Sequence, residues 1–279
     1  MWVLLAVFSA ILLGTYDVAK KQALRKNGTF AVLLVATALS TLFVSPFLRI
    51  GPAQDHLKLA LKAVLVTASW VSGMEGLKRL PLTTVSTIKG SRPVFVVLFS
   101  IILFGERLNW MQWLGIAIVL GALYMLGFTS RRDASAQVRK TGFIWMGISV
   151  LTGVASALYD KYIMKGMEPM FVQSWTNLFI TVILALCVLV KRLQARSDKF
   201  RWDWTLVLVA VLITGADALY FFALKQPDAL LSIISVVRRA SVLVTFVLGA
   251  IIFHEGNIRA KGLNMLLMAA GVVLLLIGS

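Results

Sequence analysis

The chain has few charged residues, one cysteine and two histidines. Only 14% of its 279 residues are charged, whereas 59% are hydrophobic, and the mean hydropathy is +0.87. Because about a quarter of the residues of a soluble protein are charged, this composition excludes an ordinary soluble domain. The lone Cys187 excludes a disulfide framework. Because Cys and His are scarce, no metal site and no cofactor are expected.

Long apolar runs take the place of the missing charge. Each is about 20 residues long, which is the length that a helix needs to cross a hydrocarbon core. Gly, Pro, Asn and charged residues separate the runs. The sequence therefore predicts an all-α membrane protein with ten transmembrane helices, at residues 2–19, 30–48, 57–77, 81–104, 109–128, 141–164, 169–190, 204–224, 228–253 and 257–278.

The net charge of +16 comes mainly from Lys and Arg in the connections between these runs. Positive connections are typical of membrane proteins, so the lipid bilayer is the expected partner and nucleic acid is not. The odd-numbered connections hold most of these residues, which predicts that they are cytoplasmic and that both termini are outside. No cleavable signal peptide is expected, and a bacterial inner membrane is the predicted location.

An internal repeat relates the two halves of the chain. Residues 76–104 align with 223–253, and the Tyr-Asp pair at 16–17 recurs at 159–160. Each half contains five predicted helices, and because five is odd the second half would enter the membrane inverted. Inverted repeats are typical of secondary transporters, whose substrate site lies between the halves near the midplane. Two repeats make a complete site, so a monomer is sufficient.

The predicted division is a first five-helix repeat at 1–128, a basic polar connection at 129–140 and a second five-helix repeat at 141–279. The end of each repeat resembles a known family. FGERLNWMQWLGIAIVLGALYML in the first and FHEGNIRAKGLNMLLMAAGVVLLL in the second resemble the EamA branch of the drug/metabolite transporter superfamily.

Lys89 and the Arg238-Arg239 pair add a narrower resemblance. They fall where phosphate-translocating members of that superfamily, such as plastid triose-phosphate translocators, hold basic residues on the phosphate of their substrate. The resemblance implies a transporter that prefers anionic substrates.

Four cationic side chains lie inside predicted helices, and at a helix centre each costs about 2.5–3.5 kcal/mol on insertion scales. They are therefore expected to face the bundle interior. Arg92 aligns with Arg239 across the repeat, which predicts that both reach one central space, whereas Arg238 is expected to make a structural contact. The predicted substrate-binding residues are Lys89, Arg92, Arg239, Arg238, Tyr159, Trp70 and Tyr220.

Intramembrane acids leave two interpretations open. Asp217, with Glu75 second, is a candidate coupling site, because a carboxyl group in a low-dielectric cavity can bind and release protons. Glu106 and Glu255 are expected to cap the helices that follow them. The alternative is purely structural pairing of the four cations with the acids at positions 17, 75, 160 and 217.

The sequence as a whole predicts a secondary active transporter. It would move a small anionic metabolite or lipid head group, with phosphate-bearing compounds among the candidates, by alternating access, driven by a proton, a sodium ion or a counter-substrate. Export of amino acids or amphipathic drugs is the first alternative, and a non-transporting membrane scaffold subunit is the second. The chain lacks the motifs of intramembrane hydrolases, so it is not predicted to be an enzyme.

Overall fold

The computed structural model describes residues 1–279 except 78, 81–87, 90, 130–139, 194–199 and 254–257. The described residues form helices and connecting segments without a strand, which confirms the predicted all-α class. In chain order the helices are α1 (Trp2–Leu24), α2 (Thr29–Val44), the short 3-10 helix η1 (Ser45–Phe47), α3 (Ala53–Leu77), α5 (Arg92–Phe104), α6 (Trp110–Thr129), α7 (Lys140–Met164), α8 (Pro169–Leu193), α9 (Trp204–Lys225), α10 (Leu231–Arg239), α11 (Ser241–Phe253) and α12 (Ile258–Ile277).

Seven helical segments among the described residues are long and apolar enough to cross a membrane. They coincide with seven of the ten predicted spans. Shorter apolar helices occupy the remaining three, at Arg92–Phe104, Trp110–Met125 and Gly262–Ile277. Large apolar side chains are exposed along many of these helices, as expected for surfaces that face lipid.

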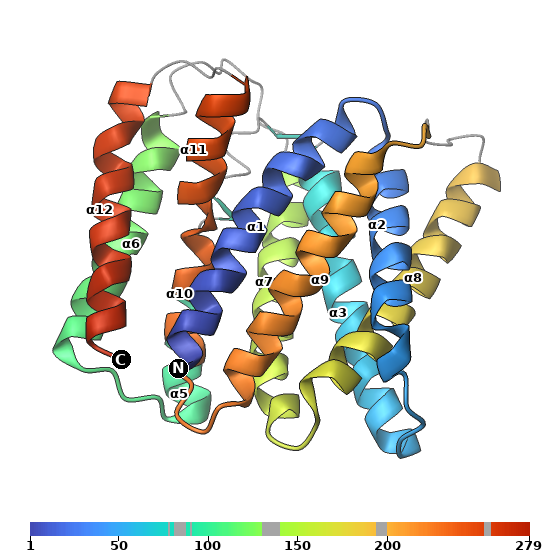
Figure 1. Cartoon of the computed structure of the whole chain (residues 1–279), viewed down its shortest axis with the longest axis horizontal. Coiled ribbons are helices and arrows are strands. Elements are labelled where there is room, and N and C mark those ends of the chain that lie inside the picture. The colour runs from blue at the N-terminus through green and yellow to red at the C-terminus, as the bar shows by residue number, and fades with distance from the viewer. Residues whose placement is uncertain (78, 81–87, 90, 130–139, 194–199, 254–257) are drawn as a thin grey trace.

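The two halves of the chain pack against one another throughout the bundle (Figure 1). The most extensive contacts join α1 to α9, α3 to α7 and α6 to α12, and α2 packs on α8. In each pair, one helix comes from the first half of the chain and the other from the second. The two chain ends lie on the same side of the bundle in Figure 1.

Small residues allow two of these helix pairs to approach closely. A Cβ added to Gly115 of α6 would lie 2.9 Å from the carbonyl oxygen of Gly271 in α12, and one added to Gly271 would lie 3.0 Å from that of Gly115. Between α3 and α7, the hydroxyls of Ser69 and Ser149 each donate to the carbonyl oxygen of the other residue, at 2.8 and 2.7 Å. Small residues and hydroxyls at contacts are typical of membrane helices.

The predicted span at 228–253 contains an interruption at Ala240, although Leu231–Leu248 is long and apolar enough to cross a membrane. α10 ends at Arg239, and α11 begins at Ser241. α5 likewise begins at Arg92, with Pro93 in its first turn, where a residue without an N–H is well accommodated. Both interruptions lie directly beside arginines, Arg239 and Arg92.

Glu106 caps a different helix from the predicted one. Its buried carboxylate accepts hydrogen bonds from the backbone N–H groups of Leu231 (2.7 Å) and Ser232 (3.0 Å) and from the Ser232 hydroxyl (2.5 Å). It therefore caps α10, whose N-terminus is enclosed by protein and needs an acceptor. α6, the helix after Glu106, is capped by reciprocal bonds between Asn109 and Gln112. Glu255 lies outside the described residues.

Candidate functional site

A cavity of about 580 Å³ lies inside the bundle, and both halves of the chain line it. Its walls come from α1, α2, α3, α5, α7, α8, α9, α10 and α11, together with Lys89. α10 is an inner wall, because six of its nine residues are buried. Most of the predicted site residues line this cavity: Lys89, Arg92, Arg238, Arg239, Trp70, Tyr220 and Asp217.

Two of the arginines donate to backbone carbonyl oxygens, and Lys89 lies near a glycine of α3. An Arg92 guanidinium N–H donates to the carbonyl oxygen of Gly153 in α7, and that of Arg239 donates to the carbonyl oxygen of Lys89 at 3.2 Å. A Cβ added to Gly73 would lie 3.2 Å from Nζ of Lys89, so the ammonium group lies against α3. Within the described part of the chain, none of these three cations has a carboxylate within ion-pair distance.

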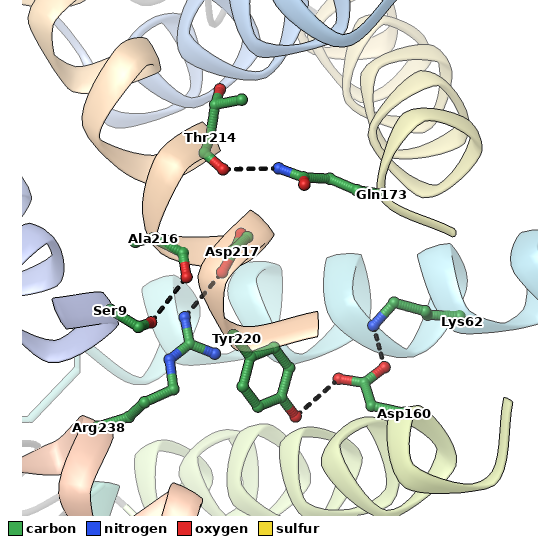
Figure 2. Close-up of polar contacts among 9 residues, drawn as sticks. All are labelled: Ser9, Lys62, Asp160, Gln173, Thr214, Ala216, Asp217, Tyr220 and Arg238. Atoms are coloured by element: carbon green, nitrogen blue, oxygen red, sulfur yellow. Dashed lines mark hydrogen bonds and ion pairs between the residues drawn. The ribbon is translucent and has the colours of Figure 1, made fainter. Parts of the chain in front are cut away.

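Arg238 has a different environment from Arg239. Its guanidinium donates to Oδ1 of Asp217 at 2.7 Å and lies 4.1 Å from the ring centroid of Tyr220 (Figure 2). An ion pair and a cation–π contact therefore hold this α10 side chain against α9. Consecutive helical residues point about 100° apart, which is why the neighbouring arginines reach different partners.

Sequence reasoning missed a buried lysine on α3. Lys62 forms an ion pair with Asp160 of α7, and the two side chains are only 4% and 7% exposed. The Tyr220 hydroxyl donates to the other carboxylate oxygen of Asp160 at 3.1 Å, as Figure 2 shows. The lysine stands alone within an otherwise apolar stretch, LALKAVLV, and that isolation was the available signal.

Asp17 and Lys20 of α1 also line the cavity, although neither was a predicted site residue. Lys20 lies 5.3 Å from the ring centroid of Tyr16. The Asp17 carboxylate interacts electrostatically with Lys20, Arg239 and Lys89. The signal for Asp17 was the repeat itself, in which it is equivalent to Asp160.

Two predicted site residues do not belong to the cavity wall. Tyr159 stacks on Tyr162, with ring centroids 5.9 Å apart, and packs against the hydrophobic core. Glu75 accepts a hydrogen bond from Arg79 at 2.6 Å, one turn further along the chain. The structural pairing considered for the four cations occurs among the described residues for one of them, Arg238.

Positive charge exceeds negative charge in the described lining of the cavity. Three acids are present, of which two are in ion pairs with Lys62 and Arg238. Six cations face them, a surplus of three charges. In a low-dielectric interior such a surplus favours the entry of an anion, and guanidinium groups suit carboxylate or phosphate because they donate two parallel hydrogen bonds. The lining cations are Lys20, Lys62, Lys89, Arg92, Arg238 and Arg239.

Comparison with known proteins agrees with this architecture. A solved crystal structure superimposes with a TM-score of 0.80 over 99% of this chain and 97% of its own, at 15% identity, which shows a shared fold. An uncharacterized transporter encoded in the cobO 3′ region of Sinorhizobium sp. is 29% identical over 136 residues, covering 46% of this chain and 95% of that protein. An uncharacterized transporter of Synechocystis sp. is 22% identical over 175 residues, covering 58% of this chain and 53% of that protein.

The family comparison covers nearly the whole chain. The model of the EamA-like transporter family matches residues 1–128 and again residues 140–277. With the apolar helices and the central charged cavity, this match makes the protein an integral membrane transporter. The chain belongs to the EamA-like transporter family.

Proposed function

We propose that this protein carries a small anionic, phosphate-bearing metabolite or lipid head group across the membrane by alternating access. The observation that carries the proposal is the surplus of three positive charges among the described residues that line a cavity between both halves of the chain. Lys89, Arg92 and Arg239 are the proposed substrate-binding cations, because their charges are not neutralised by ion pairs among the described residues. Arg238 supports the site through Asp217.

The two helix interruptions support an anion site in the same place. Pro93 at the start of α5 and Ser241 at the start of α11 both line the cavity. The N-terminus of a helix carries partial positive charge, and interrupted helices in transporters direct such termini at anionic groups. Trp70 and Tyr220 provide aromatic surface beside the charges, which suits the organic part of a metabolite.

The contacts between the halves support two inverted five-helix repeats, at 1–128 and 141–279, and ten spans. Under exchange of the halves, α1 corresponds to α7 and α9 to α3, so the α1–α9 and α7–α3 contacts are equivalent. The α6–α12 and α2–α8 contacts each correspond to themselves. A bundle built from two such units can open to either side by moving one unit against the other, with the site between them.

We propose a bacterial inner membrane location, and the charge bias of the connections supports an orientation with both termini outside. A cysteine introduced at Ser279, in a chain with Cys187 replaced by serine, tests this orientation in intact cells. Labelling by an impermeant maleimide is the expected result, and protection from it would place the termini inside.

The substrate class is tested by thermal unfolding of the purified protein with inorganic phosphate, sugar phosphates, carboxylates, neutral sugars and organic cations. A ligand that binds only the folded state raises the melting temperature, because it stabilises that state by RT ln(1 + [L]/Kd). A phosphate ester is expected to stabilise the wild type, and Arg239→Ala is expected to weaken its binding about 10- to 100-fold, because a hydrogen bond to a charged group contributes about 1.5–3 kcal/mol.

The matched control is Arg107→Ala, which removes an exposed arginine outside the cavity lining and is expected to bind like the wild type. Stabilisation by organic cations alone, equal in all three proteins, would contradict an anionic substrate. It would favour the export of amphipathic drugs instead.

A further inference from the structure

We propose that Asp17 is the proton-binding group of the cavity and that its protonation is coupled to the binding of the anion. This inference rests on the proposed function, and it makes the protein a carrier that moves a proton together with its anion. Sequence reasoning placed the coupling site on Asp217, with Glu75 second. The arrangement of ion pairs in the structure favours Asp17 over both.

The three described acids of the cavity differ in whether they form an ion pair. Asp160 is paired with Lys62, and Asp217 is paired with Arg238 at 2.7 Å. Asp17 lines the same cavity but has no ion pair among the residues that the structure describes. A carboxylate that already neutralises a fixed cation is held in its ionised form, whereas one without such a partner is free to change protonation state.

The repeat explains why Asp17 lacks the partner that Asp160 has. The two aspartates are equivalent, and extending the alignment of residue 76 with residue 223 back along α3 and α9 without a gap places Val209 of α9 where the first half has Lys62 of α3. Val209 is 1% exposed and packs in an apolar cluster with Ala19 of α1. The α3–α7 contact therefore carries a buried ion pair, whereas the equivalent α1–α9 contact is apolar at that position and leaves Asp17 open to the cavity.

Cations face Asp17 without forming a contact ion pair. Lys20 lies one turn further along α1, beside the Tyr16 ring, Arg239 comes from α10, and Lys89 comes from the segment before α5. All three cations interact electrostatically with the Asp17 carboxylate. Arg239 and Lys89 are also the cations proposed to hold the substrate, so Asp17 and the substrate share them.

The described lining residues of the other helices packed on α1 include no unpaired acid that could bind the proton in place of Asp17. α9 presents Asp217 to the cavity, and this acid is paired with Arg238 of α10. Among the described lining residues, α2 contributes Thr29 and Leu33, and α11 contributes Ser241. None of these three side chains titrates in the physiological range.

Coupling follows from the shared cations. While Asp17 is ionised, its charge competes with an incoming anion for Arg239 and Lys89 and repels the anion directly. When a proton from solution binds to a carboxylate oxygen of Asp17, that competition ends and the surplus of positive charge among the described lining residues rises from three to four. Because linkage is reciprocal, anion binding favours protonation of Asp17 by the same free energy.

The test measures proton uptake when sulfate binds to the full-length protein in detergent. Sulfate keeps its charge between pH 5 and 8, so any pH dependence comes from the protein. Calorimetry in two buffers of different ionisation enthalpy gives the number of protons taken up. We expect uptake approaching one proton per sulfate, with an affinity that falls by up to about ten-fold per unit rise in pH.

Asp17→Asn removes the competing charge and is expected to bind sulfate without proton uptake and with an affinity independent of pH. The matched control is Asp228→Asn, the same change at an exposed residue outside the cavity lining, which should keep the wild-type uptake. If Asp17→Asn does not fold, Asp17→Glu replaces it, and we expect the pH midpoint of uptake to shift. An unchanged midpoint would overturn the assignment.

The outcomes separate this inference from the proposed function. Sulfate binding without proton uptake in the wild type overturns the coupling and leaves the anion site standing. Uptake that persists in Asp17→Asn but disappears in Asp217→Asn moves the proton site to Asp217 and overturns our assignment. If neither sulfate nor inorganic phosphate binds at any pH, the proposed anion site fails, and this inference fails with it.

Discussion

Replacing Lys62 by methionine breaks a buried ion pair and keeps most of the side-chain volume. The Asp160 carboxylate would remain buried and, among the described residues, would keep the Tyr220 hydroxyl at 3.1 Å as a hydrogen-bond donor. Removing one partner of a buried pair costs about 3–5 kcal/mol, because the other charge is left uncompensated. Both side chains are less than a tenth exposed, so solvent does not screen the unpaired charge and we expect a loss of stability of about 3–5 kcal/mol.

The assay is thermal unfolding of the purified protein, followed by tryptophan fluorescence. For a chain of this size, each kcal/mol changes Tm by about 2–4 °C, so Lys62→Met is expected to lower Tm by roughly 6–20 °C. The double variant Lys62→Met/Asp160→Leu removes both charges and is expected to recover most of that loss, since an apolar pair of similar volume often replaces a buried ion pair without cost.

The matched control is Lys58→Met, one turn earlier on α3. Lys58 pairs with Asp55 at 3.0 Å, but both side chains are more than a quarter exposed, so its loss is expected to change Tm very little. A Tm of Lys62→Met close to that of the wild type would refute the reasoning. So would a double variant that is less stable than Lys62→Met, because the pair would then contribute more than the compensation of one charge.

Two further predictions test the arginine at the start of α5 and an acidic cap. A Cβ on Gly153 would lie 2.5 Å from Cζ of Arg92, so Gly153→Ala should displace the guanidinium group. We expect it to weaken anion binding about ten-fold in a ligand thermal-shift titration. Gly147→Ala, on the same helix and with open space around it, should leave anion binding unchanged. Hydrogen bonds from Lys26 and from a backbone N–H lower the pKa of Asp203 from 3.8 to about 2. This lowered pKa adds stability that is present above pH 4 and lost towards pH 2, so the Tm difference between Asp203→Asn and the wild type should shrink over that range.

The membrane class and most helix positions were predictable from composition and pattern. An apolar run of about 20 residues has few alternatives in a bilayer, since every backbone group must be hydrogen-bonded within the segment. The cations inside these runs had to face the protein interior for the same energetic reason. Lys89, Arg92, Arg238 and Arg239 line one cavity, as that argument predicted.

The partners of the buried charged side chains were not predictable from the sequence. Lys62 is 98 residues from Asp160 and Glu106 is 125 residues from Leu231, and each pairing depends on how far a helix is rotated and where it crosses its neighbour. The interruption of the predicted span at Ala240 depends equally on the packing around α10. Spacing along the chain contains none of this information.

The sequence by itself therefore determined that the chain spans a membrane, that its halves are related, and that it carries cations into an apolar interior. Those properties follow from local hydrophobicity and from repetition, which can be recognised in one dimension. The tertiary structure alone decided which acids neutralise which bases, and hence that, among the described residues, Lys89, Arg92 and Arg239 have no ion pair and share one cavity with Asp17. Ion pairs form over a few ångströms between segments far apart in the chain, so only the packed arrangement of the helices determines them.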